Sequence, residues 1–176
     1  RDEDTSESCP IAASDPAVTP VATPNAIRPI ETLKTVDLVY AYDGRTERPG
    51  LQPIERTFGR VASEIVSIQL GTGTLIEATP EHPFWVPHRG WILAKDLRAG
   101  NLLLSARDQA ISIARVEHSA NRRVAVYNFQ VREVHNYYVS EDAVLVHNCG
   151  GRKRKLMEGE QDTYRELKRA AAGDKD

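Results

Sequence analysis

The sequence predicts an all-β domain with one principal core, and three observations support this prediction. Between about residues 28 and 148, apolar and polar side chains alternate with the two-residue period of a strand rather than the period of a helix. Strand-like runs recur at short, regular intervals with turn residues between them. The chain has 176 residues, 40% hydrophobic and 27% charged, which is sufficient for one ordinary core.

The first elements of this domain alternate most clearly. In one early run the larger side chains fall on a single face: Val36, Leu38, Tyr40 and Tyr42. Further strands are expected over these runs: 65–70, 101–105, 111–117, 124–131, 137–140 and 143–146. Between Arg28 and Asn148, only the Ala94–Leu97 segment before Gly100 has the composition of a helical turn.

The two ends of the chain differ from this β region. Residues 1 to about 26 are rich in Asp, Glu, Ser, Pro and Ala, and we interpret them as an extended leader or linker. Beyond Gly150 and Gly151, the basic run 152–155 indicates a solvated linker, with a localisation signal, a nucleic-acid patch or an external protease site as alternatives. Thr163 and Glu166 are spaced as a capping box, which predicts a short C-terminal helical extension over about 164–172.

Composition argues against several classes of partner. The formal net charge of −2 provides no basic surplus for nucleic acid, and no apolar run approaches the roughly 18 residues that a membrane span needs. Without CxxC or HxxxH spacing we expect no metal and no cofactor, and we expect a monomer.

His88 and His118 are expected in exposed loops. The first residues resemble no targeting peptide, so we expect a piece of a longer protein whose compartment these residues do not indicate.

The sharpest chemical signal is a hydrophobic strand that ends in His147, Asn148 and Cys149. The side-chain amide of Asn148 can attack its own carbonyl, form a succinimide and expel the amine of Cys149. His147 can donate a proton to that amine because the pKa of an imidazole lies at about 6.5. Cys149 is itself a nucleophile. The alternative is a turn Asn followed by a small buried Cys.

A second group of residues could activate a peptide bond. Thr79 and His82 lie three positions apart, so one turn could direct both side chains at the same amide. The bond they would serve is the one before an N-terminal nucleophile. Cys9 is the candidate, since its thiol could attack the carbonyl of Ser8 and convert the amide into a thioester if the geometry favours it.

Taken together, these residues resemble the Hint (hedgehog/intein) superfamily, and most closely the bacterial intein-like and pretoxin Hint domains of polymorphic toxins. The resemblance rests on an ordered set of segments: 28–34, 37–43, 77–86, 90–100, 126–131, 135–139 and 144–149. It implies a horseshoe-like β fold over residues 9–149, with an upstream flank at 1–8 and a downstream flank at 150–176 that begins a toxin module. It also implies a bacterial parent protein, exported or on the cell surface.

The resemblance implies a role for each site residue. Cys9 would be the first nucleophile, Thr79 and His82 its activators, and Asn148 the cyclising residue, with His135 and His147 assisting and Cys149 as the downstream nucleophile. The segment after Cys9 departs from the family pattern, because its distance to Arg28 is about five residues too long. An alignment without a gap places Ser14 at the nucleophile position instead.

The predicted function is therefore single-turnover autoproteolysis at Asn148-Cys149, with an N-to-S acyl shift at Ser8-Cys9 and release of a C-terminal module. Its substrate is the flanking part of the same chain. If both steps couple, the flanks are ligated, which is protein splicing. The alternative from another class is a non-catalytic β spacer whose nucleophile has been lost.

Overall fold

The computed structural model describes residues 15–17, 19–131 and 133–147. Two 3-10 turns, η1 (Ile30–Thr32) and η2 (Ala94–Asp96), accompany the strands of this part. In chain order the strands are β1 (Asp15–Pro16), β2 (Pro20–Ala22), β3 (Ile27–Pro29), β4 (Leu38–Asp43), β5 (Arg48–Ala62), β6 (Ile65–Leu70), β7 (Leu75–Ala78), β8 (Pro83–Val86), β9 (Gly90–Leu93), β10 (Leu102–Leu104), β11 (Ala110–Ser119), β12 (Val124–Val131), β13 (Asn136–Val139) and β14 (Val144–His147).

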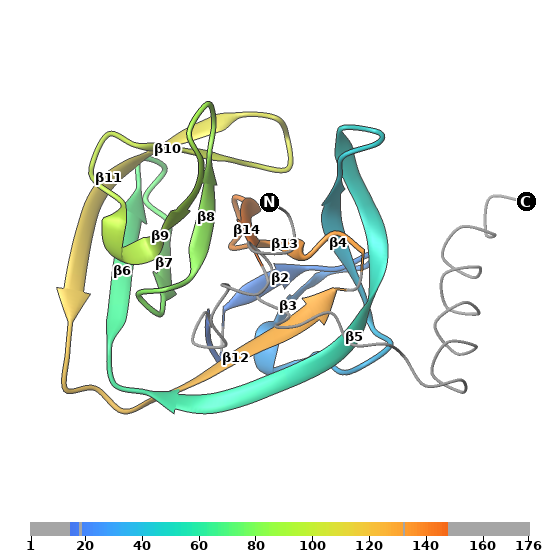
Figure 1. Ribbon diagram of the computed structural model, residues 1–176, viewed down its shortest axis with the longest axis horizontal. Helices are drawn as coiled ribbons and strands as arrows, with labels where there is room; N and C mark the ends of the chain where they lie inside the picture. Colours follow the sequence, from blue (N-terminus) through green and yellow to red (C-terminus); the bar gives the residue numbers. More distant parts are fainter. Residues whose placement is uncertain (1–14, 18, 132, 148–176) are drawn as a thin grey trace, which may run out of the picture.

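The long strand β5 organises the first sheet, whose strand order is β1-β12-β5-β4. Its first part, as far as Pro53, pairs with β4, and the part from Ile54 to Ala62 pairs with β12. The register shifts between Gln130 and Val131 of β12, and such irregularities bend a strand. Figure 1 shows β5 following the base of the molecule and then rising at one side, so that this sheet curls.

Two further sheets complete the fold. One has the order β10-β11-β6-β7, and the other has the order β3-β2-β13-β14-β8-β9. In Figure 1 the β6–β11 pair rises opposite β4 and β5, and β13 and β14 lie between these two arms. The result is a horseshoe-like arrangement in which β13 and β14, the last two described strands, are surrounded by the rest of the domain.

The core follows from this arrangement. Strand β6 alternates as a strand with one buried face should, and Val66, Ile68 and Leu70 belong to the main cluster. Strand β13 is buried along its whole length, and so is β14 up to Val146. Both strands have neighbouring strands on both edges, and because successive side chains point to opposite faces, this burial shows that neither face meets solvent as far as Val146.

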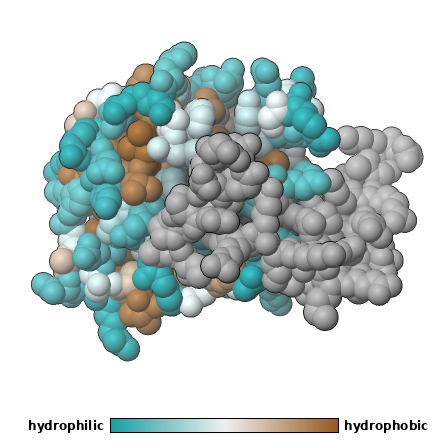
Figure 2. Space-filling view, viewed as in Figure 1, coloured by the Kyte–Doolittle hydropathy of each residue, from teal (hydrophilic) through white to brown (hydrophobic). Residues whose placement is uncertain are grey.

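The surface seen in Figure 2 is mostly hydrophilic, with separate apolar patches between charged side chains. The large exposed hydrophobic residues of the described part come from different elements rather than from one face: Ile27, Val36, Val61, Leu75 and Leu102. Isolated apolar residues of this kind are normal on a globular domain.

The all-β prediction is confirmed, and η2 lies where the sequence predicts a helical turn. The interpretation of residues 1 to about 26 as a linker is wrong from Asp15 onward. Strands β1 and β2 lie there, and Val21 has no exposed surface. Its extended backbone was predicted, but this segment is part of the domain because β2 pairs with β13 through Val21 and Val139. The flanks 1–8 and 150–176, with the C-terminal helix, lie outside the described residues.

The early alternating run also needs a correction. Val36 precedes β4, is exposed and has a φ of 79°. The fully buried side chains of β4 are Val39 and Ala41, on the face opposite the half-buried Tyr40 and Tyr42. Tyrosines suit a half-buried face, because the ring packs while the hydroxyl stays near water.

Candidate active site

The Thr79–His82 turn connects β7 to β8 and is held by backbone hydrogen bonds. The His82 N–H donates to the Thr79 carbonyl at 3.0 Å, which closes the turn. The N–H groups of Ala94 and Lys95, in η2, donate to the carbonyls of His82 and Pro80 at 2.8 and 3.0 Å. Both Thr79 and His82 are fully buried. One rigid turn therefore presents both predicted activating side chains to the interior.

The His82 ring contacts a carboxylate that the sequence did not identify as part of the site. His82 Nε2 lies 3.0 Å from Oδ2 of Asp15, and neither side chain has any exposed surface. The Tyr137 hydroxyl donates to the same oxygen at 2.7 Å. Burial, and then the negative charge of Asp15, raises the pKa of Tyr137 well above its usual value. Its phenol therefore keeps its proton and acts as a donor.

Two buried atoms of this cluster have no hydrogen-bond partner among the described residues: Oδ1 of Asp15 and Nδ1 of His82. A buried polar atom without a partner costs about 1–3 kcal/mol. The ring of His82 packs against Phe84 on its other side, with centroids 5.5 Å apart. Nδ1 of His82 therefore lies in a packed pocket and has no hydrogen-bond partner among the described residues.

A second group of aromatic side chains surrounds the end of β14. The rings of His135 and His147 are stacked, with centroids 6.5 Å apart and an interplanar angle of 19°. Trp91 meets His147 edge-on, with centroids 4.9 Å apart, and Trp85 contacts Trp91 at 5.0 Å. His147 is partly exposed, unlike His82. The two predicted assisting histidines therefore lie together at the last described residue before Asn148.

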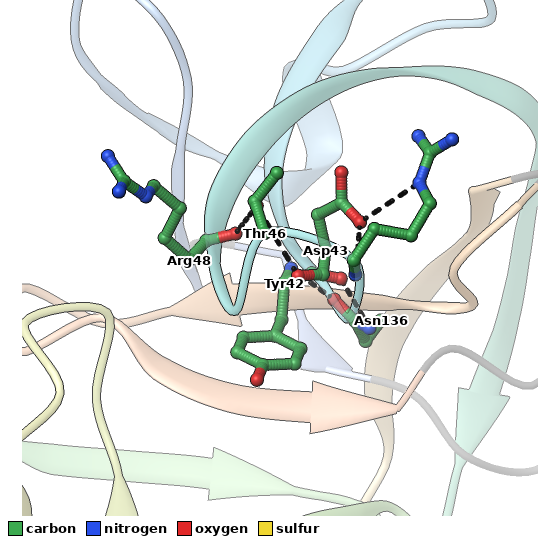
Figure 3. Close-up of polar contacts among 6 residues, drawn as sticks. Tyr42, Asp43, Thr46, Arg48 and Asn136 are labelled. Carbon is green, nitrogen blue, oxygen red and sulfur yellow. Dashed lines mark hydrogen bonds and ion pairs between the residues drawn. The ribbon is translucent and has the colours of Figure 1, made fainter.

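Asn136 fixes this end of the domain to β4. Its Oδ1 accepts a hydrogen bond from the Tyr42 N–H at 2.7 Å, and its Nδ2 donates to the Tyr42 carbonyl at 3.3 Å (Figure 3). Nδ2 also donates to the Val134 carbonyl at 3.0 Å. It also pairs with His147 across the β13–β14 ladder. Beside it, His135 has a φ of 54°, a conformation that directs the chain sharply into β13. Asn136 thus positions His135 and His147 together.

Figure 3 also shows the turn that follows Tyr42. The Arg45 N–H donates to Oδ1 of Asp43 at 2.8 Å, and this hydrogen bond lowers the pKa of the Asp43 carboxyl. The Asp43 carboxylate and Arg45 lie at the surface end of β4, so they stabilise the hairpin rather than the site.

The two groups are joined through adjacent strands. Tyr137, which binds Asp15, pairs with Val146, and Val146 pairs with Phe84, two residues after His82. The first described residue of the chain and the strand that leads to Asn148 therefore meet at one place. Cys9, Asn148 and Cys149 lie outside the described residues, and so does Ser14.

The candidate site combines the predicted Thr79–His82 turn and the predicted histidines His135 and His147 with four residues that the sequence analysis did not name: Asp15, Trp91, Asn136 and Tyr137. Asp15 is one acidic residue in an acidic, proline-rich segment, and Tyr137 lies in an apolar strand, so nothing local marks them. His88 and His118 are exposed, as predicted, but His118 lies in strand β11 and not in a loop. In the described ranges no three His, Cys, Asp or Glu side chains are placed to share a metal ion. No helix in them has the length and apolar character that a bilayer crossing requires.

A curled, all-antiparallel domain whose two ends meet beside a buried Thr-x-x-His turn belongs to the Hint class of self-processing domains. The model of the pretoxin Hint domain family matches residues 20–149, and the chain belongs to that family. The Hint resemblance and the predicted Hint fold are therefore confirmed.

Solved structures agree with this assignment. The chain is similar to a bacterial intein-like domain from Clostridium thermocellum, with 32% identity and a TM-score of 0.72 over 77% of this chain and 98% of that one. It shares the fold of the gp41-1 intein, at 22% identity and a TM-score of 0.65 over 77% and 98% of the two chains. A DnaB intein from Synechocystis has the same fold, at 17% identity and a TM-score of 0.65 over 77% and 98%. No curated protein sequence matches the chain.

Proposed function

We propose that this domain cuts its own backbone at the Asn148-Cys149 bond in a single turnover. The Nδ2 atom of Asn148 attacks the Asn148 carbonyl carbon, and the bond from that carbon to the nitrogen of Cys149 breaks. The proton lost by the amide is balanced by the proton that the departing amine of Cys149 gains. The upstream fragment then ends in a succinimide. His147 and His135 would carry the proton, and intramolecular placement supplies much of the rate.

One observation carries this proposal: the first and last described strands, β1 and β14, both meet Tyr137 of β13 beside the Thr79–His82 turn. Asp15 contacts His82 and Tyr137, and Tyr137 pairs with Val146 immediately before His147. A domain that only separates two modules does not require its ends to meet beside a buried histidine and carboxylate. A domain that reacts at both of its own junctions does require it.

We also propose an acyl shift at the upstream junction, where Cys9 and Ser14 are the two candidate nucleophiles. The position of Asp15 favours Ser14. The residue before Asp15 is one peptide unit from the partner of His82, whereas Cys9 lies six positions upstream, up to about 20 Å of extended chain. With Ser14 the hydroxyl oxygen attacks the Ala13 carbonyl carbon, the Ala13-Ser14 amide bond breaks, and an ester and a free amine form. With Cys9 the product is a thioester at Ser8.

Release of the segment that begins at Cys149 is the proposed outcome, with residues 150–176 as the start of a toxin module in an exported bacterial protein. The partner of the site is therefore its own flanking chain. If Cys149 attacked the upstream ester or thioester before Asn148 cyclised, the two flanks would be ligated. C-terminal release needs only the second reaction, so we propose release rather than splicing.

The test is the intact mass of the purified 176-residue chain, fresh and after incubation at neutral and mildly acidic pH. Autoprocessing predicts a fragment that ends at Asn148 as the succinimide, or heavier by one water after hydrolysis, and the Asn148→Ala chain should remain whole at this bond. Treatment of Asn148→Ala with a thiol or with hydroxylamine should release a fragment that begins at Ser14 or Cys9. A thioester reacts readily with the thiol, whereas an ester needs hydroxylamine.

Three outcomes oppose the proposal in different ways. If both chains keep one unchanged mass under every condition, the spacer alternative is favoured. Cleavage within 152–155 that persists in Asn148→Ala would identify an external protease. Joined flanks with the domain excised would identify splicing in place of release.

A further inference from the structure

We infer that Asp15 is a positioning residue that holds the hydrogen of His82 on Nε2 and thereby leaves the other ring nitrogen, Nδ1, as the proton acceptor for the upstream acyl shift. The inference rests on the proposed function, because it names the residue that prepares His82 for the acyl shift. It adds a role for a residue of β1, which joins the site from the start of the domain.

The geometry of the Asp15 carboxylate determines which ring nitrogen carries the hydrogen. Asp15 Oδ2 lies 3.0 Å from His82 Nε2 and 2.7 Å from the hydroxyl oxygen of Tyr137. An ionised carboxylate only accepts hydrogen bonds, so Nε2 must donate. The phenol of Tyr137 donates to the same oxygen and holds the carboxylate in place. Nδ1 of the neutral ring therefore bears the lone pair.

Other side chains of the pocket pack against the two rings. Phe84 packs against His82 with centroids 5.5 Å apart, and Phe129 packs against Tyr137 with centroids 4.3 Å apart. Asn128 Oδ1 lies 3.3 Å from the Tyr137 hydroxyl and secures its far side. Within residues 15–147 as described, Nδ1 of His82 has no hydrogen-bond partner although it is buried. Nδ1 of His82 is thus buried away from water and can accept a hydrogen bond from one further group.

This arrangement defines a proton path at the upstream junction. The lone pair of Nδ1 accepts the proton of the attacking hydroxyl or thiol. Nδ1 then donates that proton to the nitrogen of the peptide bond that breaks. While the ring carries both hydrogens, the Asp15 carboxylate lies against it and keeps Nε2 bonded.

The direct test is the protonation of the His82 ring nitrogens, measured by long-range ¹H–¹⁵N correlation on the full chain carrying Asn148→Ala. We expect a hydrogen on Nε2 at neutral and mildly alkaline pH, seen as a low-field proton that exchanges slowly. Asp15→Leu, which keeps about the same size without an acceptor, should lose that slow proton. Tyr138→Phe is the control, because it removes a hydroxyl from the opposite face of the same strand. This variant should retain the slowly exchanging proton.

A rate measurement separates positioning from general destabilisation. In the Asn148→Ala background, the upstream shift, trapped with hydroxylamine, should slow by about 10²-fold or more in both Asp15→Asn and Asp15→Leu. With Asn148 present, cleavage at Asn148-Cys149 should change by less than about threefold in the same variants. A misfolded variant would lose both reactions together.

Two results would overturn the inference: a His82 ring with Nε2 bare and the hydrogen on Nδ1, or an unchanged upstream rate in Asp15→Asn. The nitrogen measurement needs no reaction. If neither junction reacts in the unaltered chain, the proposed function fails while the role of Asp15 is still decided.

Discussion

Replacing Tyr137 by Phe isolates one hydrogen bond of the buried site. The hydroxyl of Tyr137 lies 2.7 Å from Oδ2 of Asp15, and the ring itself packs against Phe129. A hydrogen bond to a charged group contributes about 1.5–3 kcal/mol, and the substitution leaves the ring contacts in place. We therefore expect Tyr137→Phe to lower the free energy of unfolding at pH 7 by about 1.5–3 kcal/mol.

The same substitution should change how stability depends on pH. Burial and the charge of Asp15 raise the pKa of Tyr137 well above its usual value of 10.0. When folding raises the pKa of a group, that group stabilises the folded protein fully at pH values below its pKa in the unfolded chain. This stabilisation is lost as the pH rises from the unfolded pKa toward the folded pKa. The loss is about 1.4 kcal/mol for each pH unit above about 10. The stability difference between Tyr137→Phe and the parent should thus shrink by about 1.4 kcal/mol between pH 7 and pH 11.

The assay is urea unfolding followed by tryptophan fluorescence at several pH values, with Asn148→Ala in both proteins so that the chain stays intact. Burial also raises the pKa of Tyr138, but Tyr138 is present in both proteins and cancels in the difference. A difference that stays constant from pH 7 to pH 11, or that is close to zero at pH 7, would refute the hydrogen bond between Tyr137 and an ionised Asp15.

Three further substitutions, with Ile27→Ala as a control, test the fold and the downstream half of the site. Val21→Ala should lower the free energy of unfolding by about 2 kcal/mol, because Val21 is fully buried, whereas the half-exposed Ile27→Ala should change it by less than about 0.5 kcal/mol in the same melts. Trp91→Ala should slow cleavage after Asn148 roughly 10-fold to 100-fold in the mass assay, because it removes the ring against His147. His135→Asn, which tolerates the φ of 54°, should slow the same cleavage by about 10²-fold with little change in melting temperature.

Sequence patterns predicted the fold class where the strands alternate, and they failed where proline interrupts them. Strand β5 was not predicted, because Pro49 and Pro53 look like turn residues although the strand spans Arg48–Ala62. The proline-rich segment at 19–24 was interpreted as a linker for the same reason. The part of β5 that contains the prolines forms a strand because it pairs with β4, and the segment at 19–24 does so because β2 pairs with β3 and with the distant β13. Tertiary pairing of this kind overrides local composition.

The site was predictable only where a motif is local. Thr79 and His82 share one turn, and His147 lies next to Asn148, so short spacings identified them. The partner of His82 is 67 positions away in sequence, and the contact between Tyr137 and Asp15 spans 122 positions. No local pattern predicts contacts at those separations, because the curl of the sheets alone creates them. The catalytic roles of all seven predicted residues stay predictions: Cys9, Thr79, His82, His135, His147, Asn148 and Cys149.

The energetic cost of the buried cluster bears on the choice between a self-processing domain and a spacer. Asp15 and His82 have no exposed surface, and each has a second polar atom without a partner among the described residues. Each such atom costs about 1–3 kcal/mol, a large part of the 5–15 kcal/mol by which domains are stable. Well-packed apolar residues at these two positions would often make a spacer equally or more stable. Because a site that handles protons at its own junction needs these groups while a spacer gains nothing from them, their presence favours self-processing.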